Sequence, residues 1–149
     1  MKIAALDVGE RTVGVAVSDA LEITANPRTV LRRDGSELDR LAEWAADEGV
    51  ELIVVGLPYT LRGEIGPQAK KVLEFVEALR IRLDLPIETW DERFTTAEAE
   101  QRLIEAERGR AERRRVIDQL AATIILESYL EERARNRAKH QPCAGANSG

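Results

Sequence analysis

Apolar and polar residues follow one another along the chain in a pattern that predicts a domain of mixed strands and helices. Strands are expected within residues 2–6, 12–17, 23–31, 52–55 and 87–90. The first two are separated only by Gly9-Glu10-Arg11, so we expect an antiparallel hairpin. Pro27 favours an edge position or a bulge in the third strand. The unbroken apolar run 52–55 is typical of a strand that is covered on both faces.

Helices are predicted where apolar residues recur every three or four positions. They are expected from Ser36 to Gly49, after Gly66-Pro67, after Thr95 or Thr96, and from about Val116 to Arg133. This order predicts an α/β fold with a mixed five-stranded sheet, in which an antiparallel three-strand ribbon continues into parallel strands flanked by helices. We expect residues 1–133 to form one domain, and residues 134–149, which are polar and small, to be a disordered tail.

Composition narrows the class of protein. The 149 residues are enough for one domain but too few for a two-lobed kinase of the actin or sugar-kinase type. A single cysteine, Cys143, and a single histidine, His140, exclude a disulfide framework and a Cys/His zinc site. Asp7 interrupts any apolar leader, and no apolar run is long enough to span a membrane. We therefore expect a cytoplasmic protein without membrane contacts.

Charge is distributed unevenly along the chain. Residues 1–107 carry 13 basic and 22 acidic side chains, a net charge of −9, whereas residues 108–149 carry 9 and 5, a net charge of +4. The segment 108–115 lacks apolar periodicity and is predicted to be an exposed basic loop. Arginine donates paired hydrogen bonds to phosphate, so this loop is a candidate clamp for a nucleic-acid backbone. A loop that only increases solubility is the alternative.

Three acidic positions stand out from the many surface carboxylates. Asp7 ends an apolar strand, Asp91-Glu92 ends another, and Asp118 lies in the first turn of the most apolar helix. Alternation along the strand does not choose between Asp91 and Glu92. Carboxylates that converge from two strand ends and a helix start would suit Mg²⁺ or Mn²⁺, which take oxygen ligands. Such ions support phosphodiester cleavage by water.

Four ordered motifs resemble the YqgF/RuvX family. The first is Asp7-Val8-Gly9-Glu10-Arg11-Thr12-Val13-Gly14-Val15-Ala16-Val17-Ser18-Asp19, and the second is Val54-Val55-Gly56-Leu57-Pro58 with Gly63 and Gly66-Pro67. The third is Asp91-Glu92-Arg93-Phe94-Thr95-Thr96-Ala97-Glu98-Ala99, and the fourth is Ile117-Asp118-Gln119-Leu120-Ala121-Ala122 with Ser128-Tyr129-Leu130. The resemblance covers residues 2–132, nearly the whole predicted domain.

The resemblance implies an RNase H-like fold and a nuclease that processes pre-16S rRNA during ribosome biogenesis. The alternatives are a Holliday-junction resolvase acting on branched DNA and a non-catalytic nucleic-acid-binding module. By motif, Asp7, Glu92 and Asp118 are the expected catalytic metal ligands, with Asp91 as the alternative to Glu92. The expected contacts to RNA, or to branched DNA, are Arg93, Arg108, Arg110, Arg113, Arg114 and Arg115. Arg93 could equally pair with a neighbouring acid, and the chain could be a monomer or a homodimer.

Overall fold

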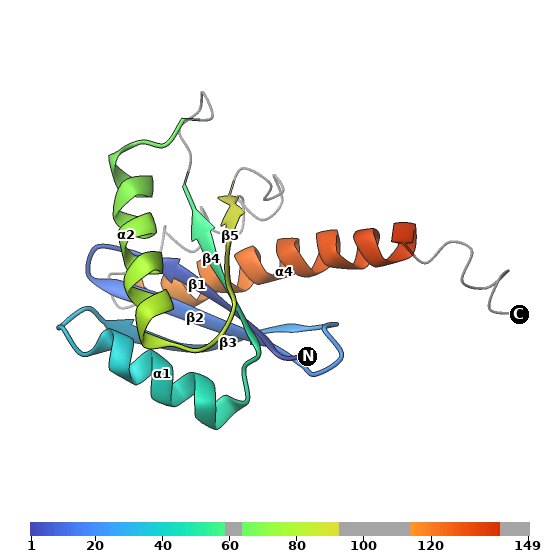
Figure 1. Cartoon of the computed structure of the whole chain (residues 1–149), viewed down its shortest axis with the longest axis horizontal. Coiled ribbons are helices and arrows are strands. Elements are labelled where there is room, and N and C mark those ends of the chain that lie inside the picture. Colours follow the sequence, from blue (N-terminus) through green and yellow to red (C-terminus); the bar gives the residue numbers. More distant parts are fainter. Residues whose placement is uncertain (59–63, 93–113, 141–149) are drawn as a thin grey trace, which may run out of the picture.

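A computed structural model describes residues 1–58, 64–92 and 114–140, with the side chains of residues 114–119 and 139–140 left outside the description. Figure 1 shows these elements in chain order. They are β1 (Ile3–Val8), β2 (Thr12–Ser18), β3 (Ala25–Arg32), α1 (Glu37–Glu48), β4 (Leu52–Leu57), α2 (Pro67–Arg82), β5 (Ile87–Asp91) and α4 (Arg114–His140). The helix predicted after Thr95 or Thr96 lies outside the described residues.

The five strands form one mixed sheet in the order β3-β2-β1-β4-β5. The pairs β1–β2 and β2–β3 are antiparallel, whereas β1–β4 and β4–β5 are parallel. This confirms the predicted ribbon that continues into parallel strands. β3 is an edge strand, and its register shifts beside Pro27, because proline has no N–H to donate to the ladder.

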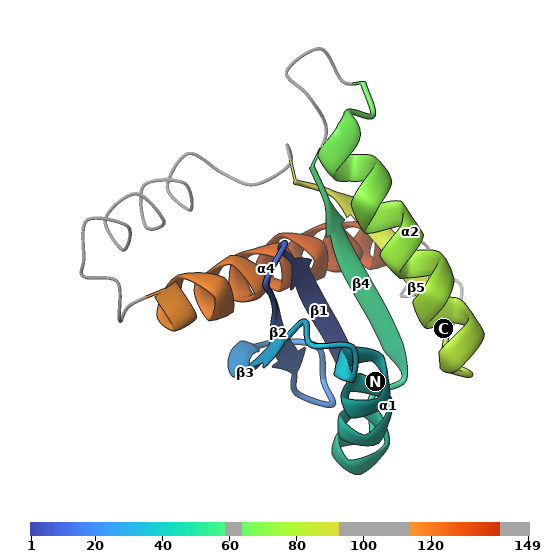
Figure 2. The same cartoon turned by 90° about the vertical axis from the view of Figure 1, so that its left-hand side faces the viewer.

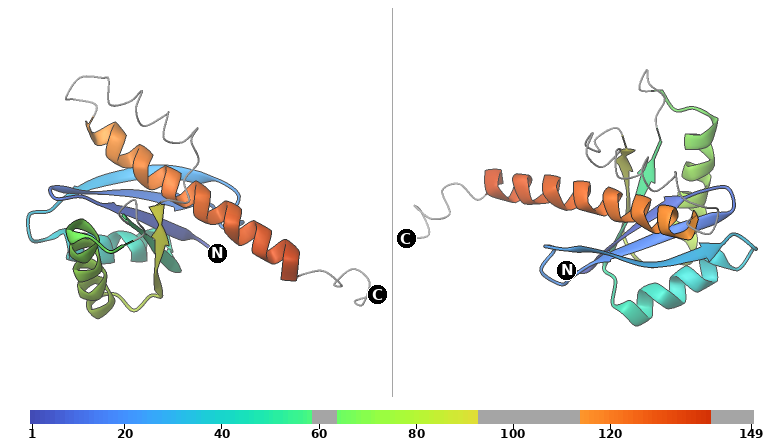
Figure 3. Two further views of the ribbon diagram at one scale, coloured as in Figure 1. Left: turned by 90° about the horizontal axis from the view of Figure 1, so that it is seen from above. Right: turned by 180° about the vertical axis from the view of Figure 1, so that it is seen from behind.

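The two faces of the sheet carry different side chains. On one face, Leu6, Val15 and Val55 pack with α1 and α2 in the larger apolar cluster. On the other face, small residues such as Ala5 and Ala16 let α4 lie close against the strands. Figures 2 and 3 show α1 and α2 on one side of the sheet and α4 on the other. The central strands are therefore covered on both faces, as the unbroken apolar run predicts.

The helix ends agree with the prediction in part. Gly49 closes α1 in a left-handed conformation (φ 77°), and Pro67 begins α2. Ser36 precedes α1, but its hydroxyl donates to Asp34 Oδ1 (2.6 Å) instead of capping the helix.

Helix α4 begins close to the predicted residue but ends later than predicted. The helix begins at Arg114 and continues to His140, not from about Val116 to Arg133. Arg114 and Arg115 are therefore helical and not part of a loop. Beyond Arg133 the chain has no proline or glycine before Pro142, and a pair three residues apart, Arg135–Glu132 (2.7 Å), supports the helix. The domain boundary at residue 133 stays a prediction.

Within the described part of the chain, no helix has the length and apolar character needed to cross a membrane.

Candidate active site

The carboxyl ends of β1, β4 and β5 meet at one edge of the sheet because these three strands are parallel. Asp7 lies near the end of β1, and Glu92 directly follows β5. On β1, Ile3 and Ala5 face α4 while Ala4 and Leu6 face α1 and α2, so alternation places Asp7 on the α4 side. One strand, β4, separates Asp7 from Glu92.

Gly56 on β4 provides the space between these acids. Leu6 pairs with Val55, so the next residues, Asp7 and Gly56, are neighbours across the two strands. A Cβ placed on Gly56 would lie 2.5 Å from Cδ1 of Ile125 in α4 and 3.3 Å from the carboxyl carbon of Glu92. The Glu92 carboxyl therefore packs over β4 at the point where that strand has no side chain.

The charge state of Glu92 reflects this packing. Burial, together with the negative charges of Asp7 and Asp91, raises the pKa of Glu92 from 4.5 to about 7. The influence of Asp7 shows that the two carboxyls belong to one electrostatic environment. The Glu92 carboxyl therefore keeps its proton to a higher pH than an exposed glutamate does.

Asp91 is placed differently from Glu92. It pairs with Leu57, which belongs to the cluster beneath α1 and α2, whereas the preceding Trp90 packs against the α4 cluster. Asp91 and Glu92 therefore lie on opposite faces at the end of β5, and Glu92 is on the face of Asp7. Which of the two binds a metal ion stays a prediction.

The structure describes the backbone of Asp118, which lies in α4, but not its side chain. It precedes Ala122 by four residues and Ile125 by seven, and both are buried against the sheet. Among the described side chains, no group of three or more His, Cys, Asp or Glu residues is arranged to hold a metal ion. Convergence of Asp118 with Asp7 and Glu92 stays a prediction.

The predicted phosphate contacts are also untested. Arg93, Arg108, Arg110 and Arg113 lie outside the described residues, and Arg114 and Arg115 begin α4 without described side chains.

Two features near the acids were not identified from the sequence. Gly56 interrupts the apolar strand 52–57, and a glycine in a strand indicates a close approach by another group. Trp90 is only partly buried and donates from Nε1 to Ser128 Oγ of α4 (2.6 Å). This bond ties the strand that precedes Glu92 to the helix that carries Asp118.

Comparisons with known proteins agree with this arrangement. The family model described as "RuvX: Holliday junction resolvase" matches residues 1–132. A protein of Desulforudis audaxviator is 50% identical over 139 residues, which cover 92% of this chain and 99% of the relative. A protein of Desulforamulus reducens is 47% identical, with 91% of this chain and 100% of the relative covered. Both carry the name "Putative pre-16S rRNA nuclease".

Solved structures show the same RNase H-like fold. RuvC of T. thermophilus in complex with a Holliday junction substrate superposes with a TM-score of 0.61 at 16% identity, covering 90% of this chain and 96% of that chain. The fowlpox virus Holliday junction resolvase gives a TM-score of 0.53 at 11% identity, with 89% and 99% covered.

The raised pKa of Glu92 predicts a pH-dependent stability in metal-free buffer. Folded Glu92 keeps its proton to higher pH than in the unfolded chain, so the free energy of unfolding should fall as pH rises from 4.5 to about 7. The loss is about 3 kcal/mol at most. Glu92→Gln cannot ionise and should lose less stability over this range. Urea unfolding of both proteins at about pH 5 and about pH 8 measures the difference. Identical pH dependence would contradict the raised pKa.

Gly56→Ala should destabilise the fold, because its methyl group meets Ile125 and the Glu92 carboxyl. We expect the free energy of unfolding to fall by about 1–3 kcal/mol in urea titrations. Adding Ile125→Val removes the Cδ1 atom that lies nearest and should restore part of the loss. Wild-type stability of the single variant would show that the space beside Gly56 is not needed.

Proposed function

The chain belongs to the RuvX Holliday junction resolvase family, and from this premise we propose that it is a metal-dependent nuclease that hydrolyses phosphodiester bonds in RNA. The observation that carries the proposal is the pair of carboxyls, Asp7 and Glu92, on one face of the sheet edge beside Gly56. The names of the relatives support the 5′ end of pre-16S rRNA as the substrate, and hence a role in ribosome biogenesis in the cytoplasm.

The donor set fits Mg²⁺ or Mn²⁺. Both ions prefer carboxylate oxygen, and the raised pKa of Glu92 indicates that a nearby positive charge would stabilise its ionised form. Asp7 and Glu92 would hold the ions, with Asp118 as the proposed third ligand. When bound, two such ions activate water and stabilise the leaving oxygen.

The chain's own residues prepare the site for this chemistry. Trp90 and Ser128 hold the end of β5 against α4, which fixes the backbone that presents Glu92. Buried Ile125 and the Glu92 carboxyl both lie beside the bare backbone of Gly56, on the face of the sheet that carries Asp7. The proposed arginines, Arg93, Arg108, Arg110, Arg113, Arg114 and Arg115, would bind the phosphate backbone and bring the scissile bond to this edge.

Branched DNA is the second candidate substrate because the family model carries the name of a junction resolvase. A module that binds nucleic acid without cleaving it is the third candidate. A single experiment that compares substrates and variants distinguishes the three.

Replacing either acid should abolish cleavage. With Mn²⁺ or Mg²⁺, Asp7→Asn and Glu92→Gln should cleave a 5′-extended 16S precursor RNA about 100-fold more slowly or worse, because each loses charge needed in the transition state. Asp91→Asn, on the opposite face, tests the alternative ligand and should remain active if Glu92 binds the metal. Full activity in Asp7→Asn would refute the site. Cleavage of four-way DNA junctions alone would favour the resolvase, and binding without cleavage by any form would favour the module.

The arginines at positions 113–115 should determine the affinity for RNA and not the rate of the chemical step. Replacing Arg113, Arg114 and Arg115 with alanine should weaken RNA binding and reduce the slope of log K against log salt by about 0.7 for each lost phosphate contact. The matched control replaces three arginines in exposed ion pairs, Arg28, Arg80 and Arg82. Equal salt slopes for the two triple variants would show that residues 113–115 do not contact the backbone.

A further inference from the structure

The loop between β2 and β3 exposes two large aliphatic side chains. Leu21 is 72% exposed and Ile23 is 71% exposed. Isolated apolar residues on a surface need no explanation, but here they lie on either side of one residue in the same short loop. The loop follows β2, which runs antiparallel to β1, so it lies at the edge of the sheet opposite Asp7 and Glu92.

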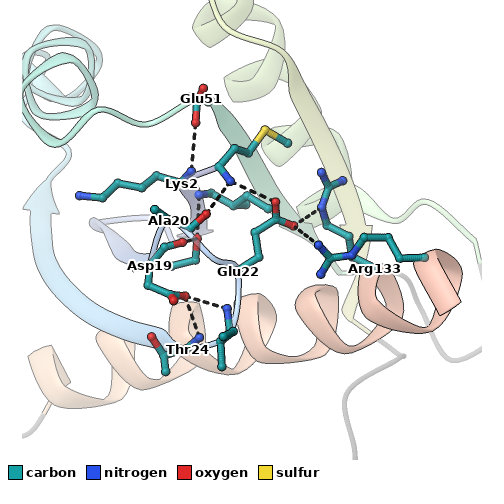
Figure 4. A network of polar contacts seen from close by, with 12 residues as sticks. Lys2, Asp19, Ala20, Glu22, Thr24, Glu51 and Arg133 are labelled. Carbon is teal, nitrogen blue, oxygen red and sulfur yellow. Dashed lines mark hydrogen bonds and ion pairs between the residues drawn. The ribbon is translucent and has the colours of Figure 1, made fainter. Parts of the chain in front are cut away.

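A network of hydrogen bonds and ion pairs holds this loop (Figure 4). The Asp19 carboxylate accepts hydrogen bonds from the backbone N–H groups of Ile23 (2.7 Å) and Thr24 (2.9 Å). Glu22 has a positive φ of 61°, and its side chain is only 8% exposed. Its carboxylate accepts from Arg133 Nε (2.5 Å) and from the Met1 amine (3.2 Å). Because Glu22 is anchored inward, its two neighbours are held on the surface.

A groove of about 580 Å³ runs between this loop and α4. Its loop side is formed by residues 22–25. Its helix side is formed by Glu127, Leu130, Glu131, Ala134 and Arg137, which recur at intervals of one helical turn or less and so lie along one side of α4. Beyond the groove, α4 projects past the sheet (Figures 1 and 3), and residues 134–138 are exposed.

The charged side chains on the helix side of the groove can pair with the same side chains of a second copy of the chain. Exposed Glu131 and Arg137 lie three residues before and three residues after Ala134. Arg137 also lies 3.9 Å from the Glu22 carboxylate of its own chain, but its side chain remains 54% exposed. If two copies of α4 cross antiparallel at Ala134, Glu131 of each copy meets Arg137 of the other. The small alanines at the crossing also allow close approach of the two helices. A uniformly acidic or basic partner would meet a like charge at one of these positions, so a second copy of this chain fits the pattern better.

We propose that residues 19–24 and the 127–137 side of α4, called here the loop–α4 surface, form the interface of a two-fold symmetric homodimer. In such an interface both subunits use the same surface, and the placement of Glu131 and Arg137 on either side of Ala134 suits this two-fold symmetry. Leu21 and Ile23 of one subunit pack on the projecting part of α4 of the other. The edge of the sheet that carries Asp7 and Glu92 stays accessible in both subunits, since it lies at the opposite end of the strands.

Charge reversal tests this interface. Sedimentation velocity at chain concentrations from about 1 µM to about 1 mM, which spans weak and moderate homodimers, should show a monomer–dimer equilibrium for the wild type. Glu131→Arg and Arg137→Glu should each weaken association by at least about tenfold, since each places two like-charged pairs in a symmetric interface. The double variant E131R/R137E restores opposite charges and should recover dimerisation.

Glu43→Arg is the matched control, because Glu43 is exposed on α1, on the other side of the sheet. It should associate like the wild type. A wild type that stays monomeric throughout, single reversals without effect, or a double variant that fails to recover would each overturn the proposal. Cleavage of RNA by monomeric Glu131→Arg is expected, so the outcome is independent of the proposed nuclease activity.

Discussion

Strands β1 and β4 are covered by helices on both faces, so their backbone groups can hydrogen-bond only to the strands beside them. Polar side chains are consequently excluded from most of their length and can occur only where a strand ends. Because β1, β4 and β5 are parallel, their carboxyl ends share one edge, and the acidic residues that follow them are brought together. The position of Asp7 and Glu92 thus follows from the way the apolar core is built.

Such a location is unfavourable for two acids unless something separates or neutralises them. Gly56 gives the Glu92 carboxyl a place to lie, but it also leaves that group partly desolvated and close to negative charge. Stability is therefore reduced at the site proposed to bind metal, a pattern that is common at functional sites. A fold optimised only for stability would place an apolar side chain at one of these positions.

Most of the sheet could be predicted from the sequence, because the strands are short apolar runs with clear breaks between them. The placement of Asp91 and Glu92 on opposite faces of the sheet could not be predicted, since it depends on the register of β5 against β4. The space beside Gly56 involves residues from β4, β5 and α4 that are far apart in the chain. The continuation of α4 past Arg133 agrees with the absence of proline and glycine before Pro142, whereas the anchoring of Arg133 by Glu22, 111 residues away, could not be predicted from any local pattern.

Helix α4 is the last described element of the chain, yet of the described helices it is the one that covers the face of the sheet to which Asp7 belongs. A chain made from its N-terminus completes all five strands before residues 122–130 exist. Until then, the apolar side chains of that face lack this cover, and the strand that precedes Glu92 lacks its bond to Ser128. The carboxylate edge is therefore finished only after residues 122–130 of α4 have been made and have packed on the sheet.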